Sequence, residues 1–501
     1  MQLQLTSTFW AGDLGLDSFA DGMALLVQGG AARLVYSEQQ LNAAMSLPLS
    51  QVNAPGSGYL PATGLADETD WSRMQPSSGM AFQDTGSEVR AFVFDAHAGA
   101  LKSCLMSASG APGAMKTVDV DGTGSLSNVE TFSIIGGAGG SDAALTTYNT
   151  PGFALYQLAN DGGLTLSAMV QDTAKSYVAN VSDTASLRLG GVDYLLTLSS
   201  LENGLTCYSI GADHKAVLND SLGTQDGLYV AGPAAMQIMQ MAGVTYAVIA
   251  ATGSSSLSVV RINDMGCLFM TDHIIDDLTT RFEHPEVLDT FTAQGRSFVV
   301  SAGTDAGISI LEMTPDGHLN PFYAVALETG AGLANVTGLE VALDGTTLQI
   351  FTIEARADRV QQFEVNLATL GGTITAAGGS ATGTAKDDLI WGSSRAETLT
   401  GGAGDDFIFG GGGGDLLWGG VGMDVFHLDV ASGTTRIADY EAHHDRIDLS
   451  EWGHIYDISA LTITATTTGA TVFFNGHGLT ITSDDGRSLA ANSFTNADFA
   501  F

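Results

Sequence analysis

Three nine-residue units follow one another without a gap at residues 401–427: GGAGDDFIF, GGGGGDLLW and GGVGMDVFH. Each matches the pattern G-G-x-G-x-D-x-U-x, in which U is a large apolar residue. The glycines permit a tight loop with positive φ. An aspartate ends the loop, and a short strand follows whose central side chain points inward. A flexible glycine-rich linker has no need of an aspartate and a large apolar residue at fixed phase. The pattern therefore predicts a coil of stacked loops and short strands.

The stacked loops also predict a metal site. Asp406, Asp415 and Asp424 would come together with peptide carbonyls of the loops. Carboxylate and carbonyl oxygens in a flexible arrangement are the ligands that Ca²⁺ prefers. Without a cation these acids would repel one another.

These repeats resemble the RTX (repeats-in-toxin) family, whose nonapeptides form a parallel β-roll. Residues 383–391 and 392–400 are degraded copies, with Lys386 and Arg395 where glycine is expected. The family places calcium between loops two repeats apart on the same side of the roll. This resemblance implies the pairs Asp406 with Asp424, Asp388 with Asp406, and Glu397 with Asp415. It also assigns to the binding loops the glycines Gly402, Gly404, Gly411, Gly413, Gly420 and Gly422.

The resemblance continues after the repeats. Residues 437–450 look like the segment that follows the repeats in type I-secreted proteases and lipases, which implies that Asp439, Asp445 and Asp448 cap the last loops. Residues 461–482 alternate strongly and predict a hairpin packed on the end of the roll. The ending Asp498-Phe499-Ala500-Phe501 is similar to signals that type I secretion machinery recognises. We therefore expect an extracellular protein, free or attached to the cell surface, that folds on calcium after export.

Composition agrees with these expectations. The formal net charge is −37, from 18 basic and 55 acidic residues. Such a chain repels nucleic acid and anionic membranes and attracts divalent cations. Only 15% of residues are charged while 45% are apolar, which favours a folded protein. Three widely spaced cysteines (Cys104, Cys207 and Cys267) disfavour a disulfide framework. We expect neither a Sec signal peptide nor a transmembrane segment.

The first 370 residues contain a weaker repeat. A glycine followed by a β-rich run recurs at Gly191, Gly243, Gly295 and Gly345, in steps of 52, 52 and 50 residues. Fainter copies lie at Gly22, Gly86 and Gly140, which makes seven. Four short strands per repeat of this length predict an all-β fold, a β-propeller, because such repeats are too long for a β-helix coil and too short for a sandwich domain.

The predicted organisation has four parts. A seven-bladed propeller spans 1–370, and the strand at 2–9 completes its last blade so that no edge stays open. A linker spans 371–382. The RTX roll and its capping segment span 383–460, and the hairpin and secretion signal span 461–501.

Two further stretches carry acidic groups. Residues 119–130 match an EF-hand loop, but helices do not flank them, so a turn between blades is favoured over a calcium site. Residues 271–286 could supply acid–base or metal groups, or form a solvated loop between blades. No H-E-x-x-H, G-x-S-x-G or C-x-x-C motif occurs, and no catalytic residue is assigned. Two hypotheses remain: a binding or structural module (an adhesin, matrix or surface-layer component) for an extracellular or cell-surface ligand, and a lactonase-type hydrolase suggested by fold analogy alone.

Overall fold

The computed structural model describes the chain in separate ranges. They are residues 3–10, 23–28, 31–38, 43–48, 53–54, 57–58, 80–85, 88–95, 100–107, 113–120, 129–136, 142–277, 280–326, 336–354, 359–376, 378–430 and 434–500. The chain divides into two compact units, residues 1–291 with 297–366 and residues 367–501 with 292–296. Each unit is described by itself. No helix in the described ranges is long and apolar enough to cross a membrane.

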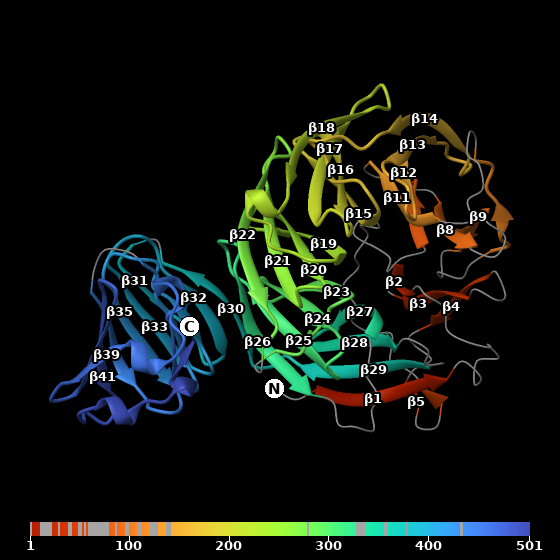
Figure 1. Ribbon diagram of the computed structural model, residues 1–501. Helices are drawn as coiled ribbons and strands as arrows, with labels where there is room; N and C mark the ends of the chain where they lie inside the picture. The colour runs from red at the N-terminus through yellow and green to blue at the C-terminus, as the bar shows by residue number, and fades with distance from the viewer. Residues whose placement is uncertain are drawn as a thin grey trace. The chain divides into compact units, whose positions relative to one another are not determined.

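Antiparallel sheets of four strands build the first unit, and they lie around a common centre as the blades of a propeller do (Figure 1). Five of these sheets follow the chain in order. Their strands are β7 (Met80–Asp84), β8 (Val89–Asp95), β9 (Ala100–Met106) and β10 (Lys116–Thr117); β11 (Val129–Ile135), β12 (Asp142–Thr147), β13 (Phe153–Leu158) and β14 (Leu164–Val170); β15 (Val181–Leu189), β16 (Val192–Ser199), β17 (Gly204–Ile210) and β18 (Ala216–Leu222); β19 (Pro233–Met241), β20 (Val244–Ala251), β21 (Ser256–Ile262) and β22 (Leu268–Ile275); and β23 (Val287–Ala293), β24 (Arg296–Ala302), β25 (Gly307–Met313) and β26 (Leu319–Ala326).

The sixth sheet joins the two ends of the first unit. It contains β27 (Val336–Asp344), β28 (Thr347–Glu354) and β29 (Arg359–Asn366), and β1 (Leu3–Trp10) pairs antiparallel with β29. The predicted completion of the last blade by the N-terminal strand is confirmed. This pairing satisfies backbone groups of β29 that would otherwise form an open sheet edge.

The prediction of seven four-stranded blades is wrong. In the described ranges six sheets have four strands, whereas β2 (Met23–Gln28), β3 (Ala31–Glu38) and β4 (Ala43–Pro48) form a sheet of three. The N-terminal strand β1 pairs with β29 and not with this sheet. The short β5 (Asn53–Ala54) and β6 (Ser57–Gly58) pair only with each other. Residues 59–79 lie outside the described residues.

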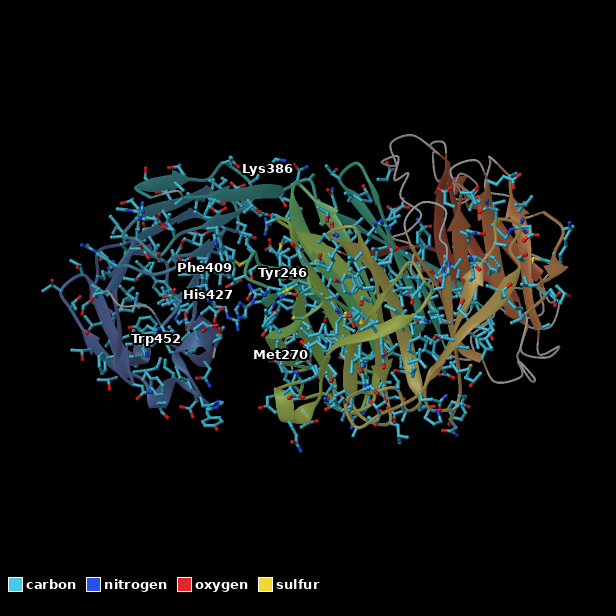
Figure 2. All side chains as sticks on the ribbon, turned by 90° about the horizontal axis from the view of Figure 1, so that it is seen from above. Tyr246, Met270, Lys386, Phe409, His427 and Trp452 are labelled. Atoms are coloured by element: carbon cyan, nitrogen blue, oxygen red, sulfur yellow. The ribbon has the colours of Figure 1, made fainter. Side chains whose placement is uncertain are left out.

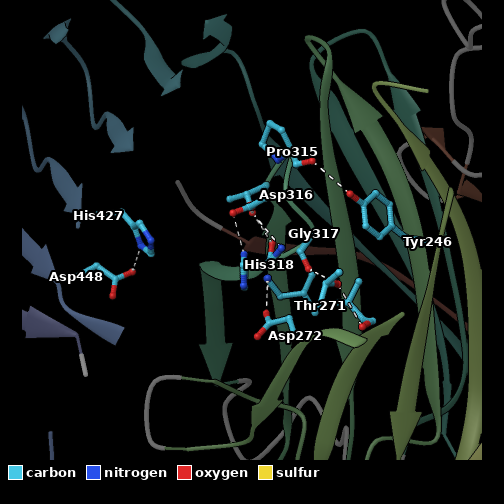
Figure 3. A network of polar contacts seen from close by, with 12 residues as sticks. Tyr246, Thr271, Asp272, Pro315, Asp316, Gly317, His318, His427 and Asp448 are labelled. Carbon is cyan, nitrogen blue, oxygen red and sulfur yellow. Dashed lines mark hydrogen bonds and ion pairs between the residues drawn. The ribbon is translucent and has the colours of Figure 1, made fainter. Parts of the chain in front are cut away.

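Neighbouring blades are joined in a repeated way. Tyr246 Oη donates a hydrogen bond to the carbonyl of Pro315 at 3.3 Å, and Leu319 N donates to Asp272 Oδ2 at 2.7 Å (Figure 3). Tyr194 and Asp264 make the first of these bonds one blade earlier, and Leu268 and Asp220 make the second. Apolar clusters fill the space between the same sheets. The sequence repeat is thus visible as a repeat of contacts between blades.

Two sheets that are mostly parallel form the second unit, a β-solenoid. One contains β30 (Leu370–Thr375), β32 (Asp387–Trp391), β34 (Phe407–Phe409), β36 (Val425–His427), β38 (Arg446–Asp448) and β42 (Phe499–Ala500). The other contains β31 (Ser380–Thr382), β33 (Thr398–Ala403), β35 (Leu416–Val421), β37 (Thr435–Tyr440), β41 (His477–Ser483), β40 (Gly469–Phe474) and β39 (Thr462–Ala465). Short 3₁₀ turns follow at η5 (Ser450–Trp452), η6 (Ile458–Ala460), η7 (Ala491–Ser493) and η8 (Asn496–Asp498); η4 (Thr224–Asp226) belongs to the first unit.

The register of the solenoid follows the nonapeptide. Ile390 pairs with Ile408 and Ile408 with Phe426, so each turn advances by two repeats. Leu399 pairs with Leu417 in the other sheet. These central apolar side chains are fully buried between the sheets, together with Trp452 nearer the C-terminus (Figure 2). The predicted inward position of the apolar residue is confirmed.

The segment predicted as a linker contains two strands of the solenoid, β30 and β31. Ile374 of β30 pairs with Ile390, and Ala381 of β31 pairs with Leu399. Both side chains therefore continue the inward columns of the solenoid. The predicted hairpin at 461–482 is present as β40 and β41, and β41 extends a solenoid sheet by pairing parallel with β37.

Candidate metal centre

The loops of the perfect repeats depend on backbone conformations that glycine adopts freely. Six glycines have φ between +82° and +147°: Gly402, Gly404, Gly411, Gly413, Gly420 and Gly422. A Cβ at Gly411 would lie 2.6 Å from the carbonyl oxygen of Ser393 in the loop below. Successive loops on one side of the solenoid therefore stack with main chain against main chain. This close approach explains the need for glycine at these positions.

One side of the solenoid carries a column of four carboxylates. Asp388 N donates to Asp406 Oδ1 at 2.8 Å, and Asp406 N donates to Asp424 Oδ1 at 2.9 Å. Asp424 N then donates to Asp445 Oδ1 at 3.1 Å. The structure thus brings together Asp388 with Asp406 and Asp406 with Asp424, the pairs expected from the sequence.

The opposite side carries a shorter column. Glu397 N donates to Asp415 Oδ1 at 2.9 Å, which brings together the third expected pair. Asp415 N faces the hydroxyl of Thr435 at 3.5 Å, so the column ends on a hydroxyl and not on another acid.

Perfect and degraded repeats differ in how the second carboxylate oxygen is used. Thr384 donates to Asp388 from its amide (2.6 Å) and from its hydroxyl (2.7 Å), and Ser393 does the same for Glu397. Glycine replaces this hydroxyl in the perfect repeats. There the Oδ2 atoms of Asp406, Asp415 and Asp424 are buried and have no hydrogen-bond partner. Thr384 and Ser393 were missed by sequence reasoning, although their place in the second position of the repeat was a usable signal.

Burial disfavours the ionised form of these three carboxylates. It raises the pKa of Asp406 to about 8, with the neighbouring Asp424 and Asp388 adding to the effect. Burial likewise raises the pKa of Asp424 to about 7 and that of Asp415 to about 6. A carboxylate removed from water needs a compensating positive charge to stay ionised.

The three acids that follow the repeats have separate roles. Asp439 accepts hydrogen bonds from Gly419 N (3.0 Å) and Gly420 N (2.9 Å) in the last glycine loop. Asp445 ends the column of carboxylates and also accepts Glu441 N at 2.8 Å.

Asp448 pairs with a histidine side chain. Its Oδ2 lies 2.9 Å from Nδ1 of His427 (Figure 3), and Ser450 N donates to its Oδ1 at 3.0 Å. The His427 ring in turn stacks on Phe409, and Phe409 on Trp391, with centroid distances of 4.8 and 3.8 Å. Hydrogen bonding from His427 keeps the pKa of Asp448 below its ordinary value despite burial.

The donor set fits a cation that accepts mixed oxygen ligands. Among the described residues no group of three or more His, Cys, Asp and Glu side chains is placed to hold a metal ion. The loops instead combine single carboxylate oxygens with main-chain carbonyls. A Cβ at Gly401 would touch both Asp406 Oδ2 and the carbonyl of Gly419, so oxygens bound the space that glycine leaves open. Carbonyls together with a few carboxylates suit Ca²⁺ better than Zn²⁺.

Acidic groups of the first unit serve the fold. Asp276 Oδ1 accepts Thr280 Oγ1 at 2.7 Å and Phe282 N at 2.9 Å, within the stretch 271–286. His273 Nδ1 lies 2.8 Å from Oγ of the buried Ser258. Most of the EF-hand-like stretch, residues 121–128, lies outside the described residues.

The innermost strands show the same use of carboxylates. Asp183 on β15 accepts Thr184 N and Met236 N, both at 2.7 Å. Asp289 on β23 repeats this arrangement with Thr290 N and Val341 N. Burial raises the pKa of Asp183 to about 7. Both carboxylates hold a neighbouring blade through its backbone.

Comparison with known proteins agrees with the geometry of the loops. The family model described as the RTX calcium-binding nonapeptide repeat matches residues 391–426 in four copies. No curated protein matches the chain. A crystal structure of a protein from Lactobacillus plantarum is similar at a TM-score of 0.39 and 11% identity, covering 67% of this chain and 95% of that one. This likeness is too distant to indicate a function. The family match and the stacked glycine loops identify residues 391–426 as RTX calcium-binding nonapeptide repeats.

Proposed function

We propose that the protein is a secreted calcium-binding protein whose solenoid folds on calcium after type I export. The observation that carries this proposal is the set of three buried, unpartnered carboxylate oxygens on Asp406, Asp415 and Asp424. These oxygens and the carbonyls of the neighbouring loops would hold calcium, whose charge offsets the repulsion within each column. Binding energy then becomes folding energy, because the unfolded chain has no such site.

The same linkage suits export. At low internal calcium the acidic solenoid would stay unfolded and could pass through a type I channel as an extended chain. Outside the cell, higher calcium would fold it. The similarity of residues 437–450 and of the final residues to type I substrates supports this route.

For the first unit we propose a binding or structural role, such as an adhesin, matrix or surface-layer component. Hydrogen bonds of Asp183 and Asp289 to backbone amides support this role over a lactonase-type hydrolase. Acids held in this way cannot act as bases without loosening the blades.

A calcium titration of the full-length chain tests the proposal. We expect calcium to raise the melting temperature of the solenoid. Calorimetry and circular dichroism measure this transition. A ligand present at 100 times its Kd stabilises a fold by about 2.7 kcal/mol per site. The variant D406N/D415N/D424N keeps the shape of each side chain and should lose most of this response.

The matched control is D457N/D484N/D485N, which removes three exposed carboxylates from the same unit. It should respond to calcium as the wild type does. An unchanged calcium response in D406N/D415N/D424N would exclude the three orphan oxygens as ligands and with them the proposed folding mechanism.

A further inference from the structure

One end of the blades β11–β26 carries a continuous set of loops. In a four-stranded antiparallel blade the connection between the second and third strands lies at the same end as the connection to the next blade. We call these segments the loop face. They are residues 148–152, 171–180, 200–203, 223–232, 252–255, 276–277, 280–286 and 303–306.

Hydrogen bonds join neighbouring segments of the loop face. Asn149 N donates to Asn180 Oδ1 at 2.9 Å, and Asn180 Nδ2 donates to Ser200 Oγ at 2.7 Å. Gly232 N donates to Asn203 Oδ1 at 2.8 Å.

The same pattern continues to the last of these blades. Asp276 N donates to the carbonyl of Ser255 at 2.8 Å, and His284 N donates to Ser255 Oγ at 3.1 Å. Thr304 N donates to the carbonyl of Glu283 at 2.7 Å. The loops therefore form one pre-organised surface, and little ordering entropy would be lost on binding.

Large apolar side chains stand out on this surface. Tyr148, Leu201, Tyr229 and Ile275 are 54%, 68%, 62% and 61% exposed, and each lies in a loop-face segment or at its border. The segments that carry these residues are joined by the hydrogen bonds given above. The ring of Tyr229 also contacts His273, two residues before Ile275, with ring centroids 6.4 Å apart. Exposed apolar side chains also occur elsewhere in this unit, at Met169, Val217 and Met265, but these four lie on or beside loops that hydrogen bonds join.

The charge of the loop face is strongly one-sided. Its segments contain eight acidic residues, Asp172, Glu202, Asp226, Asp276, Asp277, Glu283, Glu286 and Asp305, against Lys175 and Arg281. The described turns between third and fourth strands, at the other end of the same blades (159–163, 211–215, 263–267 and 314–318), contain four acids and one lysine. Both ends have the same ratio of four acids to one base, and the loop face carries the larger net charge, −6 against −3, because its segments are longer. A cationic partner complements this charge.

We propose that the loop face docks a cationic, apolar-rich segment of another protein. Lysine and arginine of the partner would meet the acidic rim, and its apolar side chains would cover Tyr148, Leu201, Tyr229 and Ile275. A glycan fits less well, because Leu201 and Ile275 offer no flat ring on which a sugar could stack. This inference rests on the proposed role of the first unit as a binding module.

The test uses the full-length protein in calcium and a fluorescent peptide in which lysine alternates with tyrosine and leucine. Binding is followed by fluorescence anisotropy at physiological salt. The variant D226N/D277N/E286Q should weaken binding about tenfold or more, as expected when several charge pairs are lost. Its matched control, D161N/D213N/D264N, removes three acids from the turns at the other end and should change affinity less than about twofold.

A second pair of variants tests the apolar part. Leu201→Ser should weaken peptide binding, whereas Met265→Ser, which alters a side chain 66% exposed at the other end, should not. Equal weakening by the two charge variants would mean non-specific attraction to an acidic protein and would overturn the proposal. So would no peptide binding by the wild type, or binding of neutral polysaccharide instead that is lost in Tyr229→Ala. Calcium-dependent melting is recorded on the same samples, so docking can fail while the calcium-driven fold stands.

Discussion

Single side chains decide which loops of the solenoid have an open oxygen. Thr384 and Ser393 stand in the second position of the degraded repeats, and their hydroxyls occupy the carboxylates of Asp388 and Glu397. In the perfect repeats glycine in this position leaves the Oδ2 of the following aspartate without a donor. In the degraded repeats a hydroxyl therefore bonds to a carboxylate, whereas in the perfect repeats one carboxylate oxygen has no donor.

Removing one hydroxyl tests this difference. Thr384→Val keeps the shape of the side chain but removes a hydrogen bond to a buried carboxylate, so we expect a loss of about 1.5–3 kcal/mol in the free energy of unfolding. Thr400→Val, in the next repeat of the same unit, should change it by less than about 0.5 kcal/mol. Urea denaturation in calcium measures both. A neutral Thr384→Val would show that Asp388 is satisfied by other donors.

The columns of carboxylates link successive loops of the solenoid. Burial is the main cause of the raised pKa values of Asp406, Asp424 and Asp415, and neighbouring acids add to it. A column of such groups makes the stability of the calcium-free solenoid depend on pH. The column also couples successive loops, since each acid accepts the amide of the acid one turn below.

The sign of this pH dependence follows from the direction of the shifts. A carboxyl whose pKa is raised on folding stabilises the fold below its unfolded pKa of 3.8, and this contribution is lost as pH rises through the folded values of about 6 to 8. In EDTA we therefore expect a smaller folded fraction of the solenoid at pH 8 than at pH 5, and a lower melting temperature where a transition is detected. Saturating calcium should remove or reverse this difference.

Thermal melts of the full chain in EDTA and in calcium provide the measurement. The variant D406N/D415N/D424N, whose amides do not titrate, should lose most of the pH dependence in EDTA. If the melting temperatures of the variant and the wild type decrease equally between pH 5 and pH 8, the titrating groups lie elsewhere in this acidic chain.

At the scale of the whole molecule, the first unit depends on its two ends meeting. β1 is the outer strand of the sheet that also contains β27, β28 and β29. In addition, β2 contacts β27. The unit is therefore held together by contacts between residues more than 300 positions apart. Such closure costs loop entropy but removes an open edge.

Deleting residues 3–10 tests the closure. Because β29 would become an unpaired edge, we expect a lower melting temperature for the first unit and aggregation that increases with protein concentration. Light scattering and calorimetry would measure both effects. Calcium-dependent melting of the solenoid should remain and serves as the internal control. Unchanged melting of the first unit would mean that β1 contributes little to its stability.

The sequence by itself determined what depends on local chemistry. Glycine at fixed spacing, an acid and a central apolar residue specify the loop, the strand and the turn of the solenoid, because φ preferences and the alternation of side chains act over a few residues. The repeats of about 50 residues likewise predicted four-stranded blades, and these are present. The resemblance to the RTX family, whose calcium lies between loops two repeats apart, implied the three carboxylate pairs in advance.

Only the tertiary structure decided what depends on distant contacts. Among the described residues it showed six four-stranded sheets and not seven, placed 370–375 and 380–382 in strands, and paired Asp448 with His427. It also showed which carboxylate oxygens lack a donor and which loops share one face of the blades. Local sequence does not determine these outcomes. Each depends on which groups from separate turns or blades compete for the same hydrogen bond or the same buried space.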